Sequence, residues 1–387
     1  MSVEFLPFHV PSITEDEIQA VVETLRSGWL TTGPRVKQFE QDFARALGVT
    51  HAITVNSGTA ALHLALEAVG VKEGDEVLVP TMTFAATAEV VLYLKANPVL
   101  VDCQRDTLNI DPEQIEQKIT AKTKAIVPVH FAGQPCEMDR ILTIAQKYRL
   151  RVIEDAAHAL PARYRGKLIG SIGDITCFSF YVTKPVTTGE GGMITTENEK
   201  YADRMRIMSL HGISKDAWKR YTAEGSWYYE ILSPGYKYNL TDIAAALGIE
   251  QLKKCEQFWQ SRKRIAAMYN EGLADLPEIQ TPKCHPDVQH AWHLYVIQLE
   301  LARLQTSRNE FIEALKAANI GTSVHFIPLH LHPYYRNAFG YELKDFPIAS
   351  AVFDRIVSLP IYPRMTDSQI EYVISTVRQI VQQHRKP

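Results

Sequence analysis

One lysine of this sequence stands in a setting that favours chemistry over simple solvation. Lys184 lies in the stretch FSFYVTKPVTTGEGGM, between aromatic residues and a turn rich in threonine and glycine. Pro185 restricts Lys184 to an extended or turn conformation, and a confined lysine beside aromatic rings can have a lowered pKa. An uncharged amine can form a Schiff base. The alternative is a lysine whose aliphatic chain runs past Phe178 and Tyr181 and keeps its charge in water.

Two adjacent acids form the second chemical feature. Glu154 and Asp155 end an apolar stretch that begins at Arg151, and two alanines and His158 follow. Neighbouring strand residues face opposite ways, so only one of the two carboxylates can enter a given pocket. The small alanines leave room for a bulky ligand. An acidic surface loop is the alternative explanation.

The third feature is Ser57-Gly58-Thr59, which follows the apolar stretch Ala52–Val55 and opens an expected helix. Gly58 permits close approach of the backbone to a ligand, and the start of a helix offers free N–H groups and a positive dipole end. This combination suits a phosphate group. An ordinary serine N-cap is the alternative explanation.

Together the three features match the needs of pyridoxal 5′-phosphate (PLP). Its aldehyde needs an amine, and its ring nitrogen needs a carboxylate that keeps it protonated as an electron sink. Its phosphate needs N–H and hydroxyl donors. Each feature alone has an ordinary explanation, whereas the combination is much more specific.

Alternating strands and helices must position these residues. Their order predicts an α/β fold with a mostly parallel sheet covered on both faces, with ligands beyond the carboxyl ends of the strands. We expect a large α/β domain over residues 1–250, with an N-terminal segment 1–35, and a small C-terminal α+β domain over residues 251–387. The expected strands of the large sheet are Ala52–Val55, Glu76–Val79, Val99–Val101, Ala125–His130, Arg151–Glu154, Ile175–Tyr181 and Met193–Thr196. The expected helices of the large domain are Thr14–Arg26, with a Thr14/Glu17 capping box, Thr59–Val69, Phe84–Leu94, Met138–Tyr148 and Asp242–Cys255. The elements expected in the small domain are His293–Leu299, Arg308–Ala318, Thr322–Phe326 and Asp367–Gln383.

Composition and charge narrow the classes of function. The net charge of the 387 residues is −3, so nothing favours nucleic acid or an anionic membrane as a partner. No run reaches the roughly 18 uncharged apolar residues of a membrane span, and residues 1–8 lack the pattern of a signal peptide. The five cysteines are scattered and form no CxxC pair, which favours reduced thiols. We expect a cytoplasmic protein that binds neither nucleic acid nor membrane.

The motifs of the chain, taken in order, resemble the DegT/DnrJ/EryC1/StrS family of PLP-dependent nucleotide-sugar aminotransferases. The matching segments are SGWLTTGP, NSGTAALHLAL, GDEVLVPTMTFAAT, KAIVPVHFAGQPCEMD, VIEDAAHA, FSFYVTKPVTTGEGGM, GYKYNLTDIAAALG and HAWHLYVI. They cover nearly the whole chain. The resemblance implies a fold type I PLP-transferase, in which a large α/β/α sandwich domain is followed by a smaller α+β domain.

The resemblance also implies roles for individual residues. Lys184 matches the Schiff-base lysine, and Asp155 matches the partner of the pyridinium nitrogen. The other implied cofactor contacts are Phe84 stacked on the ring, His158 near the phenolic oxygen, Ser57, Gly58, Thr59 and Ser179 around the phosphate, and Asn239 reaching the phosphate from a partner subunit. Weaker matches, taken as sugar contacts, are Thr31, Thr32 and His325. The role of Asn239 implies a homodimer with shared active sites.

The implied reaction moves an amino group from L-glutamate to C4 of a nucleotide-linked 4-keto sugar, with pyridoxamine 5′-phosphate as the halfway form. Its product would serve cell-surface polysaccharide or lipopolysaccharide synthesis. Three segments, FLPFHVPSI, YNLTD and HAWHLYVI, resemble enzymes that aminate a UDP-4-ketopentose, which favours a UDP-linked substrate. Two others, GQPCEMD and WYYEI, resemble enzymes that make 4-amino precursors of pseudaminic acid. The sugar therefore stays open. Leu240 stands where the family often has arginine, so a substrate contact from that arginine is not expected.

Other functions are weighed against this one. A sugar dehydratase of the same fold is the nearest alternative, although such relatives can carry histidine at the position of Lys184. A non-catalytic PLP-binding regulator would normally add a DNA-binding module, and the sequence shows no basic helix-turn-helix stretch. His325, His330 and His332 have a spacing that can be read as a metal cluster, but nothing acidic flanks them. We expect no metal.

Overall fold

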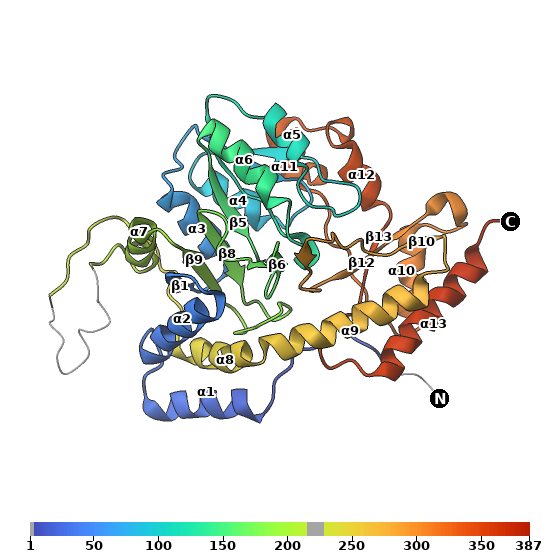
Figure 1. Cartoon of the computed structure of the whole chain (residues 1–387), viewed down its shortest axis with the longest axis horizontal. Helices are drawn as coiled ribbons and strands as arrows, with labels where there is room; N and C mark the ends of the chain where they lie inside the picture. Colours follow the sequence, from blue (N-terminus) through green and yellow to red (C-terminus); the bar gives the residue numbers. More distant parts are fainter. Residues whose placement is uncertain (1–3, 215–227) are drawn as a thin grey trace.

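The structure is a computed structural model that describes residues 4–214 and 228–387, and a seven-stranded sheet forms its centre (Figure 1). The strands are β1 (His51–Val55), β2 (Glu76–Pro80), β3 (Asn97–Val101), β4 (Thr123–Ile126), β5 (Arg151–Asp155), β8 (Ile175–Ser179) and β9 (Gly192–Thr196). Their order across the sheet is β1-β9-β8-β5-β4-β2-β3. β9 is antiparallel to both of its neighbours, and the other neighbouring pairs are parallel. The expected mostly parallel α/β sheet is confirmed.

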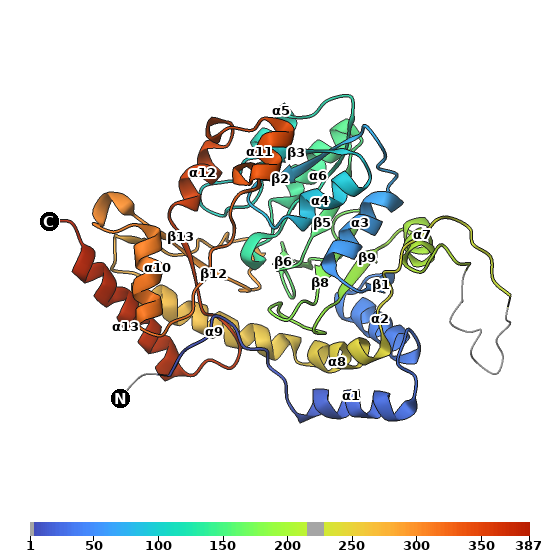
Figure 2. The ribbon, with the colours of Figure 1, turned by 180° about the vertical axis from the view of Figure 1, so that it is seen from behind.

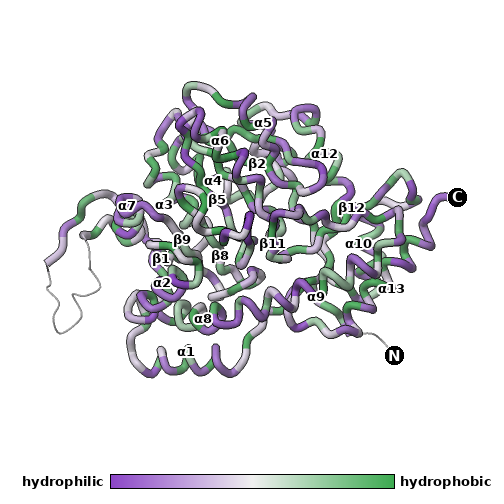
Figure 3. Tube along the Cα trace, in the orientation of Figure 1, coloured by the Kyte–Doolittle hydropathy of each residue, from purple (hydrophilic) through white to green (hydrophobic). Residues whose placement is uncertain are grey.

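The two faces of this sheet belong to two separate hydrophobic cores. Val77 and Val79 of β2 pack in the first core and Leu78 packs in the second, because successive strand residues alternate in direction. Helices of the first core include α3 (Gly58–Ala68), α4 (Ala86–Tyr93) and α7 (Glu199–Ser209). Helices of the second core include α2 (Pro34–Leu47), α5 (Pro112–Gln117), α6 (Met138–Tyr148) and α8 (Asp242–Lys253). Figure 3 shows hydrophobic residues concentrated in this interior. The arrangement is the expected α/β/α sandwich.

A smaller antiparallel sheet lies in the C-terminal part of the chain, and a long helix leads to it from α8 (Figures 1 and 2). Its strands and helices are β10 (Ile279–Gln280), β12 (Tyr295–Leu299), β13 (Ile356–Leu359), α9 (Cys255–Leu273), α10 (Arg308–Ala317) and α13 (Asp367–His384). Side chains of all six elements form a third core. A domain boundary near residue 250 remains a proposal: the separate sheet supports it, although Leu329, Tyr335 and Phe346 pack in the first core of the large sheet.

The remaining elements lie at the edges of these layers. They are α1 (Glu15–Ser27), α11 (Pro333–Phe339), α12 (Pro347–Phe353) and a three-stranded sheet of β11 (Val288–Gln289), β6 (Arg163–Tyr164) and β7 (Lys167–Leu168). The expected capping box of Thr14 and Glu17 begins α1 and is confirmed. Within the described ranges, no helix has both the length and the apolar character needed to span a membrane.

Some expected boundaries were wrong. β4 ends at Ile126 rather than His130, because Pro128 has no N–H to continue the ladder. β8 ends at Ser179 and not at Tyr181. The expected element Thr322–Phe326 makes only a single bridge, from Ser323 to Ser358, and the strand beside it, β13, was not expected.

A buried carboxylate joins the start of α2 to the start of α8. Asp242 accepts hydrogen bonds from the backbone N–H groups of Gly33, Arg35 and Val36 at 2.8, 3.1 and 2.9 Å. Its own N–H donates to the carbonyl of Thr31 at 3.1 Å. Gly33 has no side chain with which to cap α2, so Asp242 takes over that role from a position about 200 residues away in sequence.

We expect Asp242→Ala to lower the free energy of unfolding by about 1–3 kcal/mol, because it leaves buried N–H donors without an acceptor. The measurement is the shift of the urea midpoint followed by circular dichroism. Asp367→Ala is a matched control, since Asp367 also begins its helix but its exposed carboxylate pairs with Arg264 at the surface. Such pairs contribute roughly 0–1 kcal/mol. Equal midpoints for the two variants would contradict the capping role of Asp242.

Candidate active site

A cavity of about 630 Å³ lies beyond the carboxyl ends of β1, β5 and β8. This is where a parallel α/β sheet normally binds its ligand. The cavity brings together most of the residues that the sequence singled out. Those that line it are Ser57, Gly58, Thr59, Phe84, Asp155, His158, Ser179, Lys184 and His325.

Asp155, and not Glu154, faces the cavity. Ile153 packs in the first core and Val152 in the second, so the alternation of β5 sends Asp155 to the side of α3 and α4. Thr87 Oγ1 donates to Asp155 Oδ2 at 2.9 Å, and the N–H of Ala157 donates to Oδ1 at 3.1 Å. Burial raises the pKa of this carboxyl, and these two donors together with the nearby Lys184 act in the opposite direction. The group is thus a buried acid held in a fixed orientation.

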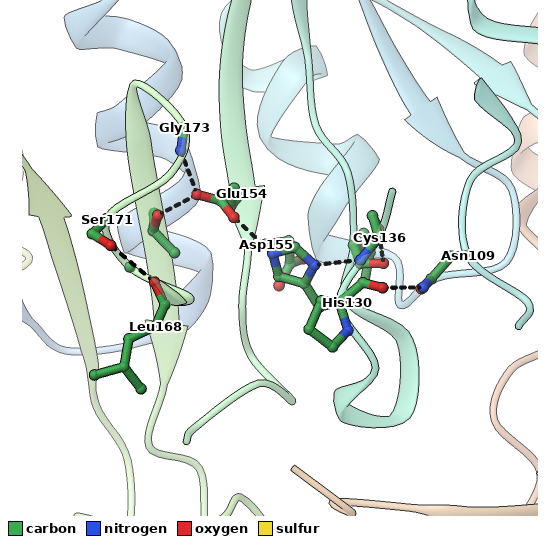
Figure 4. A network of polar contacts seen from close by, with 12 residues as sticks. Asn109, His130, Cys136, Glu154, Asp155, Leu168, Ser171 and Gly173 are labelled. Carbon is green, nitrogen blue, oxygen red and sulfur yellow. Dashed lines mark hydrogen bonds and ion pairs between the residues drawn. The ribbon is translucent and has the colours of Figure 1, made fainter. Parts of the chain in front are cut away.

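Glu154 points to the opposite core, where its carboxylate is fully engaged (Figure 4). Oε1 accepts from Thr176 Oγ1 at 2.8 Å and from the N–H of Gly173 at 2.7 Å. His130 Nδ1 accepts from the N–H of Cys136, so His130 Nε2 carries the hydrogen that it donates to Glu154 Oε2 at 2.9 Å. This network anchors the end of β5 behind Asp155. The acidic-surface-loop alternative is therefore wrong for both acids.

Lys184 lies in a tight turn directly after β8. Its N–H donates to the carbonyl of Tyr181 at 2.9 Å, and its half-buried side chain lines the same cavity as Asp155. Burial lowers the pKa of the amine to about 8, although the attraction of Asp155 acts in the opposite direction. About a tenth of the amine is then neutral at pH 7, several hundred times more than for an ordinary lysine. A neutral amine is what a carbonyl-reactive lysine needs.

The start of α3 forms another wall of the cavity. Ser57 Oγ accepts from the N–H of Ala60 at 3.1 Å, so Ser57 is an ordinary N-cap and lines the cavity as well. A Cβ at Gly58 would lie 2.9 Å from the Cβ of Ser179, so only glycine lets α3 approach β8 this closely. The first N–H groups of a helix have no partner within it and suit an anion.

Aromatic and imidazole rings form the remaining wall. Phe84 is 64% exposed, and its ring centre lies 6.1 Å from that of Phe326. His158 stacks on Phe326 at 5.9 Å and lies 4.4 Å from His293. Nδ1 of His158 and Nδ1 of His293 are buried without a hydrogen-bond partner among the described residues. Burial keeps the pKa of both imidazoles well below the usual value, so both rings are neutral.

The sequence analysis missed several residues of the cavity. Thr87, which holds Asp155, lies within the motif GDEVLVPTMTFAAT, and His293 lies within HAWHLYVI, so position in a motif could have indicated both. His9 also lines the cavity. It lies within the motif FLPFHVPSI, but only the fold brings residue 9 to Val182, whose carbonyl accepts from His9 Nε2 at 3.1 Å.

Three expected site residues lie outside this cavity in the single chain. Asn239 and Thr32 line a second cavity of about 470 Å³, where Asn239 Nδ2 donates to Thr32 Oγ1 at 2.7 Å. Thr31 is exposed.

The histidine cluster also separates in space. His330 is buried, with one ring nitrogen bonded to Thr81 Oγ1 at 2.7 Å and the other to Ser350 Oγ at 2.9 Å, whereas His325 lines the main cavity. Both ring nitrogens of His330 are therefore used in hydrogen bonds within the fold. Within residues 4–214 and 228–387, no three His, Cys, Asp or Glu side chains are grouped so that they could hold a metal ion.

The main cavity fits pyridoxal phosphate. Its amine, buried carboxylate, helix start and exposed aromatic face match the aldehyde, ring nitrogen, phosphate and ring of the cofactor. The unpartnered Nδ1 of His158 offers a hydrogen-bonding atom within the same wall. The volume leaves space for a substrate beside the cofactor.

The titration of Lys184 can be measured directly in the cofactor-free protein. We expect its labelling by an amine-reactive reagent, followed by mass spectrometry, to rise with a midpoint near pH 8, against about 10.5 for an unperturbed lysine. Asp155→Asn should move the midpoint lower still, because the burial penalty remains while the attraction to the carboxylate is lost. Glu154→Gln is the control and should leave the midpoint in place. Identical midpoints in all three proteins would contradict the assignment of Asp155 to the cavity.

Known proteins show the same organisation. Residues 11–378 match the DegT/DnrJ/EryC1/StrS aminotransferase family. The chain is 55% identical over 381 residues to an uncharacterized protein of Methanocaldococcus jannaschii, with 98% of this chain and 99% of that protein covered. It is 53% identical over 378 residues to the spore coat polysaccharide biosynthesis protein SpsC of Bacillus subtilis, with 97% of each covered.

Solved structures agree with the sequence relatives. The chain superposes on Spr1654, a candidate sugar aminotransferase of Streptococcus pneumoniae in its PMP form, with a TM-score of 0.91 and 37% identity over 99% of this chain and 98% of that one. The PLP form of Spr1654 gives the same TM-score. Fold, cofactor and activity therefore converge: this chain belongs to the DegT/DnrJ/EryC1/StrS family and is a PLP-dependent sugar aminotransferase that uses pyridoxal and pyridoxamine 5′-phosphate.

Proposed function

We propose that this enzyme transfers an amino group from L-glutamate to C4 of a nucleotide-linked 4-keto sugar, most simply a UDP-linked one. The product is a 4-amino sugar nucleotide for a cell-surface polysaccharide or lipopolysaccharide, made in the cytoplasm. The observation that carries the proposal is that Lys184 and Asp155 line one cavity of about 630 Å³. The likeness to SpsC, described as a spore coat polysaccharide biosynthesis protein, supports the assignment to surface carbohydrate.

Lys184 acts as the proton carrier in this proposal. When bound, PLP supplies an aldehyde carbon for the amino group and a ring that stores the electron pair left at the reacting carbon. Lys184 Nζ, whose lowered pKa makes the neutral form accessible near pH 8, takes a proton from the α-carbon of the donor and returns it on the substrate side. Asp155, fixed by Thr87 and the N–H of Ala157, holds the proton of the ring nitrogen.

Other residues hold and orient the bound molecules. Ser57, Gly58, Thr59 and Ser179 bind the phosphate at the start of α3, and Phe84 and His158 bind the ring. His325 is the sugar contact supplied by the same chain. Its Nδ1 bonds to Ser358 Oγ at 2.9 Å, which leaves Nε2 for the sugar.

The test is a screen of amine transfer. Purified holoprotein is incubated with L-glutamate and a panel of UDP- and dTDP-linked 4-keto sugars, and 2-oxoglutarate and the amino sugar are quantified by mass spectrometry. We expect equimolar products with at least one UDP-linked sugar, and a rate lower by about 10²-fold or more with Lys184→Ala. Transfer to free sugars alone, or at a carbon other than C4, would overturn the proposed substrate.

We also propose that two copies of the chain share their active sites. The support is that Asn239 and Thr32 contact each other but lie away from Lys184 within one chain. A second copy would bring both to the cavity, where Asn239 binds the phosphate and Thr31 and Thr32 bind the sugar. Asn239 also accepts from Lys237 Nζ at 2.5 Å, which adds positive charge suited to a phosphate.

Mixing two inactive variants tests this arrangement. Lys184→Ala removes the amine, and Asn239→Asp sets a negative charge against the phosphate. If sites are shared, a mixed dimer has one site with both lesions and one with neither, so activity should rise to about a quarter of the wild-type value at complete exchange. The expected share follows because half of the dimers are mixed and each has one intact site. No recovery, with exchange shown by native mass spectrometry, would mean that each chain builds its own site.

A further inference from the structure

A buried arginine lies directly behind the turn that carries Lys184. Arg262 is only 2% exposed and sits on the same face of α9 as Phe258. Its Nε and Nη1 are buried, and neither has a hydrogen-bond partner among the described residues. An ionised side chain is almost never fully buried without a partner, because the lost hydration is worth several kcal/mol.

Arg262 borders a small cavity that is distinct from the main one. The cavity has a volume of about 10 Å³ and lies between α9, the N-terminal segment and the Lys184–Pro185 turn. His9 and Lys184 line both cavities, so they form the wall between them. Ser12 Oγ, a second buried polar atom without a described partner, also borders it. Three hydrogen-bond donors without acceptors therefore surround one space.

No described residue supplies the missing negative charge. The cavity lining contains no aspartate or glutamate. Gln251, which lines the cavity, donates to Glu17 Oε1 at 2.9 Å, but Lys254 Nζ already binds that carboxylate at 2.9 Å. Burial lowers the pKa of Arg262 to about 10, so the guanidinium stays charged at neutral pH. Burial lowers the pKa of His9 to about 4 and holds that of His293 well below its usual value, and the charge of Arg262 acts in the same direction on both.

We propose that this cavity binds a single monatomic anion, a halide such as chloride, between Arg262 and Ser12. An anion accepts from Nε–H, Nη1–H and the serine hydroxyl at once and neutralises the guanidinium, whereas a water molecule leaves the charge uncompensated. A cavity of about 10 Å³ holds one water-sized species. That volume does not hold a whole amino acid, and the comparison with acetate separates a halide from a carboxylate.

Bromide locates the ion directly. Crystals of the holoprotein are grown in sodium bromide, and anomalous differences are measured at the bromine edge. We expect a peak within about 3.5 Å of Arg262 Nη1, at the distance of a charge-assisted contact. Density without an anomalous signal in high bromide identifies a water molecule and overturns the proposal, whatever the variants show.

Stability in solution gives a second readout. Gluconate is replaced stepwise by chloride or bromide at constant ionic strength. The melting temperature of the holoprotein should rise, and above Kd the rise should follow the logarithm of the halide concentration, as for any ligand of the folded state. Arg262→Met should remove the dependence. Arg264→Met is the matched control on the same helix, because Arg264 pairs with Asp367 at the surface, and it should keep the dependence.

The remaining outcomes are also decisive. If Arg262→Met fails to fold, Ser12→Ala should raise several-fold the halide concentration at which the melting temperature begins to increase. A wild-type protein whose melting temperature does not respond to halide contradicts the proposal. An equal response to acetate, lost in Arg262→Met, would show that the site takes carboxylates and would overturn the assignment to a monatomic ion.

Discussion

Successive residues of a β-strand point to opposite faces, and at the end of β5 this alternation gives two neighbouring acids different surroundings. Asp155 enters the cavity on the side of α3 and α4, while Glu154 is bound within the other core by His130, Thr176 and Gly173. The same alternation in β8 puts Ser179 beside Gly58 at the start of α3. The position of the amine is then fixed by the turn that follows β8. The site thus depends on the register of two adjacent parallel strands.

The charge state of Asp155 and Lys184 in the main cavity depends on two opposing effects, burial and their mutual attraction. Burial alone would keep both the Asp155 carboxyl and the Lys184 amine neutral, and the attraction between them opposes that effect in each. The imidazoles around them, His158, His293 and His325, have pKa values lowered by burial and add no positive charge. The lysine is therefore the only described cationic side chain lining this cavity at neutral pH. A proton on Lys184 can leave or return with small changes in its surroundings.

Much of this site follows from local sequence. The strand–helix alternation predicted which segments along the chain form the strands and helices of the large domain. Residues after three of those strands indicated the amine, the acid and the helix start of the site. What local sequence left open was set by contacts between distant segments. Which of Glu154 and Asp155 enters the cavity depends on which core each face of β5 packs in. The hydrogen bond from Thr87 to Asp155 depends on how close α4 lies to β5. The place of His9 in the cavity and the unpartnered burial of Arg262 show the same limit, since both arise only in the folded chain. The early end of β4 does not, because Pro128 could have indicated it from the sequence.

The Asp242 contact has a consequence for binding at Thr32 and Asn239. Thr32 Oγ1 donates to the carbonyl of Leu240 at 2.6 Å and accepts from Asn239 Nδ2, while Asp242 ties both flanking segments together. The two side chains therefore come from distant parts of the chain but form a preorganised pair. Much of the loss of conformational entropy that a ligand would otherwise impose on them has already occurred during folding. A flexible loop carrying the same two residues would bind the same ligand more weakly, with no contact changed.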